Sequence, residues 1–309
     1  MNSFLRPSHW SVVLTLVSAS FVSVFAADPP KPLHDLLVIG GGYHDYARQK
    51  DILKAGIEER AYVDVELAYV PAANTEERAQ FEIFSKPDWA KPYDIIIHDE
   101  CSAGITNLEY IAKILEPHKT GLPAVFLHCA MHSYRSAGWV ANAPSMTPWF
   151  ELTGLQTTGH GAQRPIELTM LDDQNPITKG MTNWTTVNEE LYNNIARKLL
   201  DTATPMIRGK QGTSETVVAW GNLYNGKAKV FGTTIGHNNM TVSDPRYLDL
   251  VTRGLLWAAG KLEPAYLKPA PKATGSIDLL PTDSEIAALL TKDTLALLAE
   301  QSDAECGCQ

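Results

Sequence analysis

Histidine residues follow several apolar runs of the chain, at the points where strands are expected to end. His44, His98 and His128 each come directly after such a run or within two residues of it, and residues 124–127 are the most apolar of these runs. If the runs are parallel strands, the imidazoles gather at the carboxyl edge of one sheet, where open α/β sheets bind ligands. Imidazole transfers protons near neutral pH and also binds metal ions. The spacing therefore predicts a polar site at this edge.

Three residues are the candidates for catalysis. His128 stands at the sharp turn after its strand, where a side chain is presented above the sheet as an acid or base; the alternative is a buried, hydrogen-bonded histidine. His237 follows residues 233–236 in a similar position, and Glu190 could orient an imidazole or act with it as an acid–base pair. The neighbouring Glu189 fits a solvated acid on a loop.

Other residues are candidates for binding a substrate. Tyr43 and His44 follow three glycines that let the backbone approach a ligand, although the full dinucleotide fingerprint is missing. Trp139 and Trp149 could provide an aromatic platform for a sugar ring, with a place in the core as the alternative. His160 could close over the site as part of a lid. A sixth candidate, Tyr192, lies two residues after Glu190.

The cysteines leave several possibilities open. A zinc site could be built from His98, Cys101, His128, Cys129 and His132. This spacing matches no standard zinc pattern, so no residue is assigned as a metal ligand, and a Cys101–Cys129 disulfide or two buried thiols is the more ordinary interpretation. Cys306 and Cys308 are too close in sequence for an unstrained bond with each other.

The elements that must position these residues alternate between strand and helix in the first half of the chain. Strands are expected at residues 36–42, 63–70, 94–98 and 124–129, and helices at 46–59 and 107–115, the second ended by Pro117. Crossover helices connect parallel strands, so the pattern predicts a flavodoxin-like, doubly wound and mostly parallel α/β sheet.

The second half has a long irregular part and then more regular elements. Residues 136–183 contain one expected strand, at 165–171, and are otherwise typical of functional loops or lids. Further strands are expected at residues 205–208, 216–220 and 228–234, with a hairpin turn at 224–226, and an amphipathic helix at 245–259.

Both ends of the chain differ from this domain. Residues 1–26 have the charge, apolar stretch and small residues of a secretory signal peptide, with an uncleaved membrane anchor as the alternative. We therefore expect a secreted or periplasmic protein, with one α/β domain at residues 27–262. Residues 263–309 are expected to be a Pro-rich linker and a helical tail, the helix at 282–300.

The charge balance argues against one class of partner. The chain has a formal net charge of −9 and no basic stripe, so nucleic acid is not an expected partner. After removal of the leader no membrane contact is expected either. The sequence leaves the oligomeric state open, a homo-oligomer included.

Several motifs in order resemble those of one family. They are residues 36–44, 121–130, 189–192, 218–220, 234–237 and 253–260. Together they resemble the ThuA-like (trehalose utilisation) family over residues 34–261. The resemblance implies a class I glutamine amidotransferase-like fold and a role in carbohydrate metabolism. It also implies that His128 takes the place of the amidotransferase cysteine nucleophile.

The chain departs from this family at two positions. Cys129 follows His128 where a small residue is common, and Glu189 stands where an aspartate is frequent. We expect an enzyme that acts on a disaccharide or an oxidised (keto) glycoside by His/Glu acid–base or metal-assisted chemistry. The alternatives are a non-catalytic carbohydrate-binding protein and, less in keeping with the sequence, a true amidotransferase that uses Cys129.

Overall fold

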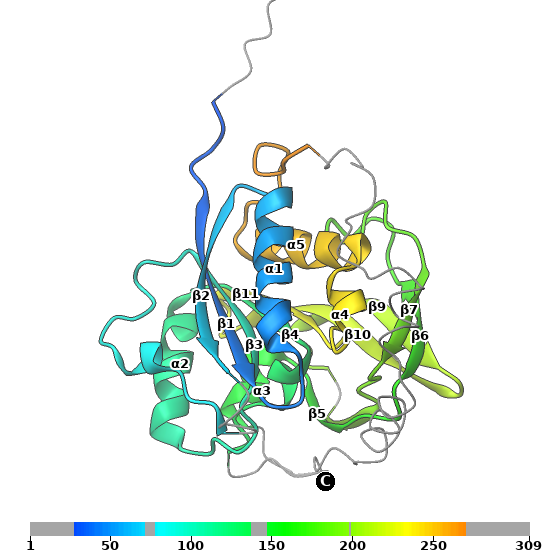
Figure 1. Ribbon diagram of the computed structural model, residues 1–309, viewed down its shortest axis with the longest axis horizontal. Coiled ribbons are helices and arrows are strands. Elements are labelled where there is room, and N and C mark those ends of the chain that lie inside the picture. Colours follow the sequence, from blue (N-terminus) through cyan, green and yellow to red (C-terminus); the bar gives the residue numbers. More distant parts are fainter. Residues whose placement is uncertain (1–27, 72–77, 137–146, 198, 270–309) are drawn as a thin grey trace, which may run out of the picture.

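A nine-stranded sheet forms the centre of the molecule (Figure 1). The computed structural model describes residues 28–71, 78–136, 147–197 and 199–269. The strands of this sheet are β1 (Leu33–Gly41), β2 (Val63–Val70), β3 (Ile95–Cys101), β4 (Ala124–Leu127), β6 (Arg164–Met170), β7 (Trp184–Glu189), β9 (Ala203–Gln211), β10 (Ser214–Tyr224) and β11 (Ala228–Thr233). A second, two-stranded sheet pairs β5 (Gln156–Gly159) with β8 (Asn194–Arg197).

The sheet has a parallel half and an antiparallel half. Its order is β2-β1-β3-β4-β11-β10-β9-β6-β7, and the first five strands pair in parallel. This is the flavodoxin-like order, in which ligands bind where the strand order reverses, here beside β1 and β3. The remaining pairs are antiparallel. The doubly wound fold class expected from the sequence is confirmed, and the later strands extend it into a mixed sheet.

Helices cover both faces of the parallel half (Figure 1). The longer helices are α1 (Tyr46–Arg60), α2 (Leu108–Thr120) and α5 (Pro245–Ala258); the shorter ones are α3 (Pro148–Thr153), α4 (Asn239–Val242) and the 3-10 turns η3 (Glu82–Ser85) and η4 (His128–His132). Helices α1 and α5 pack with alternate strand residues such as Leu37 and Ile97. On the other face α2 and α3 pack with Val38 and Ile96, so the strands are buried on both sides.

Strand β3 is longer than expected. The three residues after His98 were expected beyond the strand end, but they pair with β1 as far as Gly41 opposite Cys101. The ladder continues because Gly41 has no side chain: a Cβ built there would lie 2.4 Å from the carbonyl oxygen of Cys101. His98 is consequently a core residue, paired in register with Val38 on one side and Phe126 on the other.

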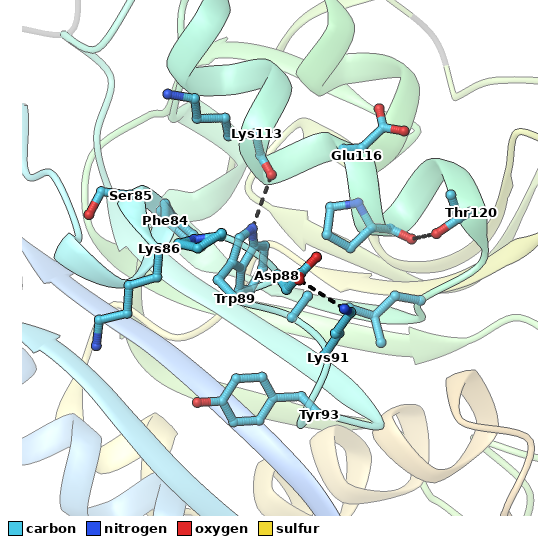
Figure 2. Close-up of a pocket in the computed structure, with 14 residues that line it drawn as sticks. Phe84, Ser85, Lys86, Asp88, Trp89, Lys91, Tyr93, Lys113, Glu116 and Thr120 are labelled. Carbon is cyan, nitrogen blue, oxygen red and sulfur yellow. Dashed lines mark hydrogen bonds and ion pairs between the residues drawn. The ribbon is translucent and has the colours of Figure 1, made fainter.

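Helix α2 also runs past its expected end. Pro117 lies within it rather than ending it. A proline inside a helix leaves one carbonyl of the preceding turn without its usual donor. Trp89 supplies the missing donor, because its indole Nε1 donates to the carbonyl of Lys113 at 3.1 Å. Figure 2 shows this bond on the wall of a hollow of about 670 Å³ between residues 84–93 and α2.

The hairpin turn and the amphipathic helix expected in the second half are confirmed. The turn between β10 and β11 has Asn225 at φ 50° and Gly226 at φ 65°, the left-handed pair that a tight hairpin requires. Asp244 caps α5 by accepting from the backbone N–H of Arg246.

Not all expectations fall within the described residues. The signal peptide, Trp139, the helix at 282–300, Cys306 and Cys308 lie outside them. Residues just after the expected domain end still contact the sheet region, because the N–H of Tyr62 donates to the carbonyl of Tyr266 at 2.9 Å. Among the described residues no helix is long and apolar enough to cross a membrane.

Candidate functional site

Three parallel strands bring His44, His128 and His237 to one place. These residues follow β1, β4 and β11, which belong to the contiguous parallel half of the sheet. The ring centroid of His44 lies 4.7 Å from that of His128 and 4.9 Å from that of His237, and the last two are 5.5 Å apart. The predicted gathering of distant imidazoles at the carboxyl edge is therefore present.

His128 occupies a strained turn at the start of η4. Its backbone φ is 41°, in the left-handed region that non-glycine residues rarely adopt and that is found at functional sites. Its Nδ1 lies 2.7 Å from the carbonyl oxygen of Thr234. A carbonyl only accepts, so Nδ1 carries the hydrogen and a neutral His128 presents the lone pair of Nε2 to the site.

Glu190 joins the imidazoles from the end of β7. Its Oε2 is 3.3 Å from Nε2 of His128 and 3.5 Å from Nε2 of His160. Its Oε1 is 3.2 Å from Nδ1 of His237, in contact but without hydrogen-bond geometry, and accepts from the amide of Gln163 at 3.1 Å. We call His44, His128, Glu190 and His237 the edge cluster.

The charges of the edge cluster are interdependent. Burial raises the pKa of Glu190, but contacts with His128 and His237 outweigh burial and hold that pKa well below its usual range. Burial lowers the pKa of His128, and Glu190 reverses the effect, so the net shift is upward. Burial, assisted by the charges of His128 and His237, lowers the pKa of His44. The arrangement favours an ionised carboxylate beside imidazoles of unequal basicity.

Aromatic and imidazole rings line one side of the edge cluster. The hydroxyl of Tyr192 lies 3.3 Å from Nε2 of His128. The ring of Tyr192 stacks on His132 with centroids 4.2 Å apart, and on His160 at 5.8 Å. The predicted residues Tyr192 and His160 are thus brought to the site, and His132 supports Tyr192 from the far side.

A family model and solved structures resemble this chain. The family model described as "ThuA: Trehalose utilisation" matches residues 72–258. The chain belongs to the ThuA family. It is similar to the solved structure of a putative ThuA-like protein from Parabacteroides merdae ATCC 43184, with 19% identity, a TM-score of 0.57, and 78% of this chain and 94% of that one covered.

A second solved structure supports the same fold. A putative ThuA-like protein from Bacteroides uniformis ATCC 8492 has 13% identity and a TM-score of 0.53, with 76% of this chain and 94% of that one covered. No curated protein matches the chain. The edge cluster must therefore be interpreted from its own geometry, within a fold that the ThuA family shares.

One of the expected substrate-binding residues, Trp149, is placed in the core. Its indole donates to the carbonyl of Ala130 at 2.8 Å, and its ring packs against Phe126 and Tyr134. The apolar face that a sugar would need is therefore covered. Tyr43 directly precedes His44 and is 45% exposed.

The sequence-based zinc constellation is not assembled. Cys101 and Cys129 form a disulfide between the end of β3 and the turn after β4, with Cα atoms 5.2 Å apart. Cys129 consequently has no free thiol for an amidotransferase nucleophile in this state. His98 points into the core, where its Nδ1 lies 2.9 Å from Oε1 of Glu100 and its Nε2 lies 3.3 Å from Nε2 of His118.

The structure adds Glu189, which the sequence suggested was a solvated acid. Glu189 is fully buried, and its carboxylate accepts from the backbone N–H groups of Gly236, His237 and Asn238 at 3.2, 3.0 and 2.8 Å. The sequence showed that Glu189 stands where an aspartate is frequent, but the turn that Glu189 binds, at residues 236–238, lies far along the chain. Glu189 therefore positions His237.

Gln163 is a second addition. Its amide nitrogen lies 2.9 Å from Nε2 of His237, in addition to its bond with Glu190. It comes from the irregular part of the chain, where no pattern distinguished it. Together with Glu189, it fixes His237 from two sides.

Proposed function

We propose that this ThuA family protein is an enzyme that transfers protons on a carbohydrate, either a disaccharide or an oxidised (keto) glycoside. The family description, trehalose utilisation, supports the substrate class. One observation carries the reaction type: the buried carboxylate of Glu190 lies within 3.5 Å of nitrogens of His128, His160 and His237. Such a group of acid and bases at a strand edge is suited to proton transfer.

The edge cluster divides the work of proton transfer between unlike groups. Glu190 is held ionised and accepts a proton from the substrate, most readily from a carbon next to a sugar ketone or from a hydroxyl. A protonated imidazole beside it donates a proton to the substrate oxygen on which negative charge develops. Tyr192 and Gln163, already hydrogen-bonded to cluster residues, supply polar contacts for sugar hydroxyls.

The experiment is turnover of a panel of disaccharides and 3-keto glycosides by wild type, Glu190→Gln and His128→Ala. Glu190→Gln keeps the shape but removes the base, so we expect a loss of about 10²–10⁴-fold in kcat. Glu215→Gln, an exposed acid in β10, is the matched control. Turnover unchanged in both cluster variants would overturn the proposal, and sugar binding without turnover by wild type would favour the carbohydrate-binding alternative.

We also propose that the protein is exported. The leader-like sequence at residues 1–26 supports this, as does the Cys101–Cys129 disulfide, since disulfides persist in oxidising compartments. The test is the N-terminal sequence and location of the protein expressed in a bacterial host. A mature chain starting near residue 27 outside the cytoplasm is expected, and an intact N-terminus in the cytoplasm would overturn the proposal.

A further inference from the structure

The imidazoles of the edge cluster have more acceptor capacity than the protein satisfies. Nδ1 of His44 and Nδ1 of His237 are buried and lack a hydrogen-bond partner among the described residues. Nε2 of a neutral His128 is an acceptor, because Nδ1 donates to Thr234, and it has the Tyr192 hydroxyl as a partner at 3.3 Å. Buried polar atoms are normally paired, so atoms left unpaired in one place point to a missing ligand.

These nitrogens converge as metal ligands do. One ring nitrogen from each of His44, His128 and His237 can be chosen so that all three lie within 4.8 Å of one another. Tetrahedral Zn²⁺ with bonds of about 2.0–2.1 Å holds its nitrogen ligands about 3.3 Å apart, so each imidazole would move inward by less than about 1 Å. Three histidines with a fourth position open are a donor set found in catalytic zinc sites.

The surroundings of the three histidines are those of ligand histidines. A metal-bound imidazole usually donates its other N–H to a carbonyl or carboxylate, as His128 does to Thr234. His237 is held through its backbone N–H by the carboxylate of Glu189. Glu190 lies beside the rings of His128 and His237. Its carboxylate supplies the negative charge that a divalent cation between neutral imidazoles would need.

We infer that His44, His128 and His237 bind one divalent transition-metal ion of the Zn²⁺ class, with Glu190 next to it. The bound ion supplies Lewis-acid chemistry at a substrate oxygen. Glu190 and His160 then remain for proton transfer. This assignment stands on the geometry of the nitrogens and does not depend on the identity of the substrate.

A competing donor set shares one residue with this one. His44 also lies within 4.8 Å of Cys101 and Cys129, taken one ligand atom each. The two sulfurs are bonded to each other, and thiolate ligands would require reduction of the disulfide. His237 belongs only to the three-histidine set, and Cys101 and Cys129 belong only to the competing set. Substitution of His237 or of the cysteines therefore distinguishes the two donor sets.

The experiment measures metal content and affinity, without turnover. The full mature chain, with its disulfide intact, is stripped with a chelator, and Zn²⁺ or Co²⁺ is added while binding and the visible Co²⁺ spectrum are recorded. We expect one ion per chain. Loss of a residue that only hydrogen-bonds a ligand histidine costs about 10–100-fold in metal affinity, so loss of a ligand itself, in His44→Ala or His237→Gln, should weaken binding by more than about 100-fold.

Two controls make the result decisive. His34→Ala removes an exposed imidazole of β1, and Cys101→Ala/Cys129→Ala removes the competing sulfurs; both should keep one ion per chain. Circular dichroism checks that each variant is folded, and His237→Gln preserves size where His237→Ala fails to fold. Wild type that retains no ion, or binding that survives His237→Gln but is lost with the cysteines, overturns the inference. Metal binding without sugar turnover would overturn the proposed function alone.

Discussion

Two groups of histidines lie beside the same sheet but differ in how their ring nitrogens are satisfied. We call Tyr134, Glu100, His98 and His118 the core chain; they are linked in that order by hydrogen bonds of 2.9, 2.9 and 3.3 Å. The chain ends where Nδ1 of His118 meets the carbonyl of Leu122 at 2.8 Å. Every ring nitrogen of the core chain therefore has a protein partner.

The edge cluster lacks this completeness. Nδ1 of His44 and Nδ1 of His237 have no hydrogen-bond partner within the described ranges, although Nδ1 of His237 lies 3.2 Å from Oε1 of Glu190. The core chain thus has every ring nitrogen paired by the protein, whereas the edge cluster leaves lone pairs open. The two groups also differ in burial, because His98 and His118 are fully buried and His44 and His237 are partly exposed.

The hydrogen positions in the core chain can be worked out from its ends. Leu122 offers a carbonyl, so Nδ1 of His118 must carry a hydrogen. Burial lowers the pKa of His118 to about 3, so it is neutral and its Nε2 accepts from His98. Nδ1 of His98 faces Oε1 of Glu100 at 2.9 Å. All four ring nitrogens of the core chain are thus paired by the protein, and its one open atom among the described residues is a carboxylate oxygen, Oε2 of Glu100.

The largest effect is expected for His98→Ala. The substitution opens a cavity against Phe126 and leaves Glu100 and His118 without their shared partner. We expect the free energy of unfolding to fall by about 3–5 kcal/mol, as for other buried pairs that lose one member. Urea denaturation measures it, with His34→Ala as the exposed control. A loss below 1 kcal/mol would mean that the core chain does not hold the fold.

The next effect is expected for Glu189→Ala, a substitution in the residue that holds the turn of His237. Three backbone N–H groups of the turn after β11 lose their shared acceptor. We expect unfolding to become easier by about 2–3 kcal/mol, and Zn²⁺ affinity to fall because His237 is no longer positioned. Glu189→Gln should recover part of both. Stability lost with metal affinity intact would show that Glu189 supports only the turn.

The pH dependence of stability is expected to come in part from the core chain. The folded pKa of His118, about 3, lies below its ordinary value of 6.5, so the unfolded chain takes up a proton that the folded one excludes. Stability is full above pH 6.5 and falls as the pH falls toward 3. One such group contributes about 1.4 kcal/mol per pH unit at most.

The measurement compares urea denaturation of wild type and His118→Gln between pH 6.5 and 4. The variant should show a shallower loss of stability, by about one proton. Burial raises the pKa values of Asp35 and Asp99, which act in the opposite direction in both proteins. The difference between the two slopes therefore isolates His118, and equal slopes would contradict its buried neutral state.

The sequence predicted the edge cluster because its logic is local and topological. His44, His128 and His237 each follow a β-branched or apolar run, and parallel strands gather their carboxyl ends whatever lies between them. The length of a strand, in contrast, depends on its partner strand. Strand β3 continues through His98 to Cys101 because β1 remains beside it, and no pattern within β3 predicts that. The place of Trp149 depended on tertiary packing in the same way.

The backbone N–H groups that donate to Glu189 could not be predicted for a related reason. Glu189 and Glu190 are adjacent in sequence but have different surroundings. The arrangement of distant strands in the sheet decides which of the two carboxylates contacts the backbone of the turn after β11. Glu190 was found because its chemistry fits imidazoles. Glu189 required the position of residues 236–238, which only the folded structure supplies.

The smallest effect has the opposite sign from the others and is expected for His44→Leu. In metal-free protein the substitution removes a buried Nδ1 without a hydrogen-bond partner in the described structure, so the free energy of unfolding should rise by up to about 1 kcal/mol. With Zn²⁺ present, wild type gains stability by mass action, about 2.7 kcal/mol at a concentration 100 times its Kd, and the variant does not. Thermal unfolding of both proteins, with and without Zn²⁺, should therefore reverse their order. If wild type is the more stable with metal removed, His44 is paired like the histidines of the core chain, and the distinction between the two groups fails.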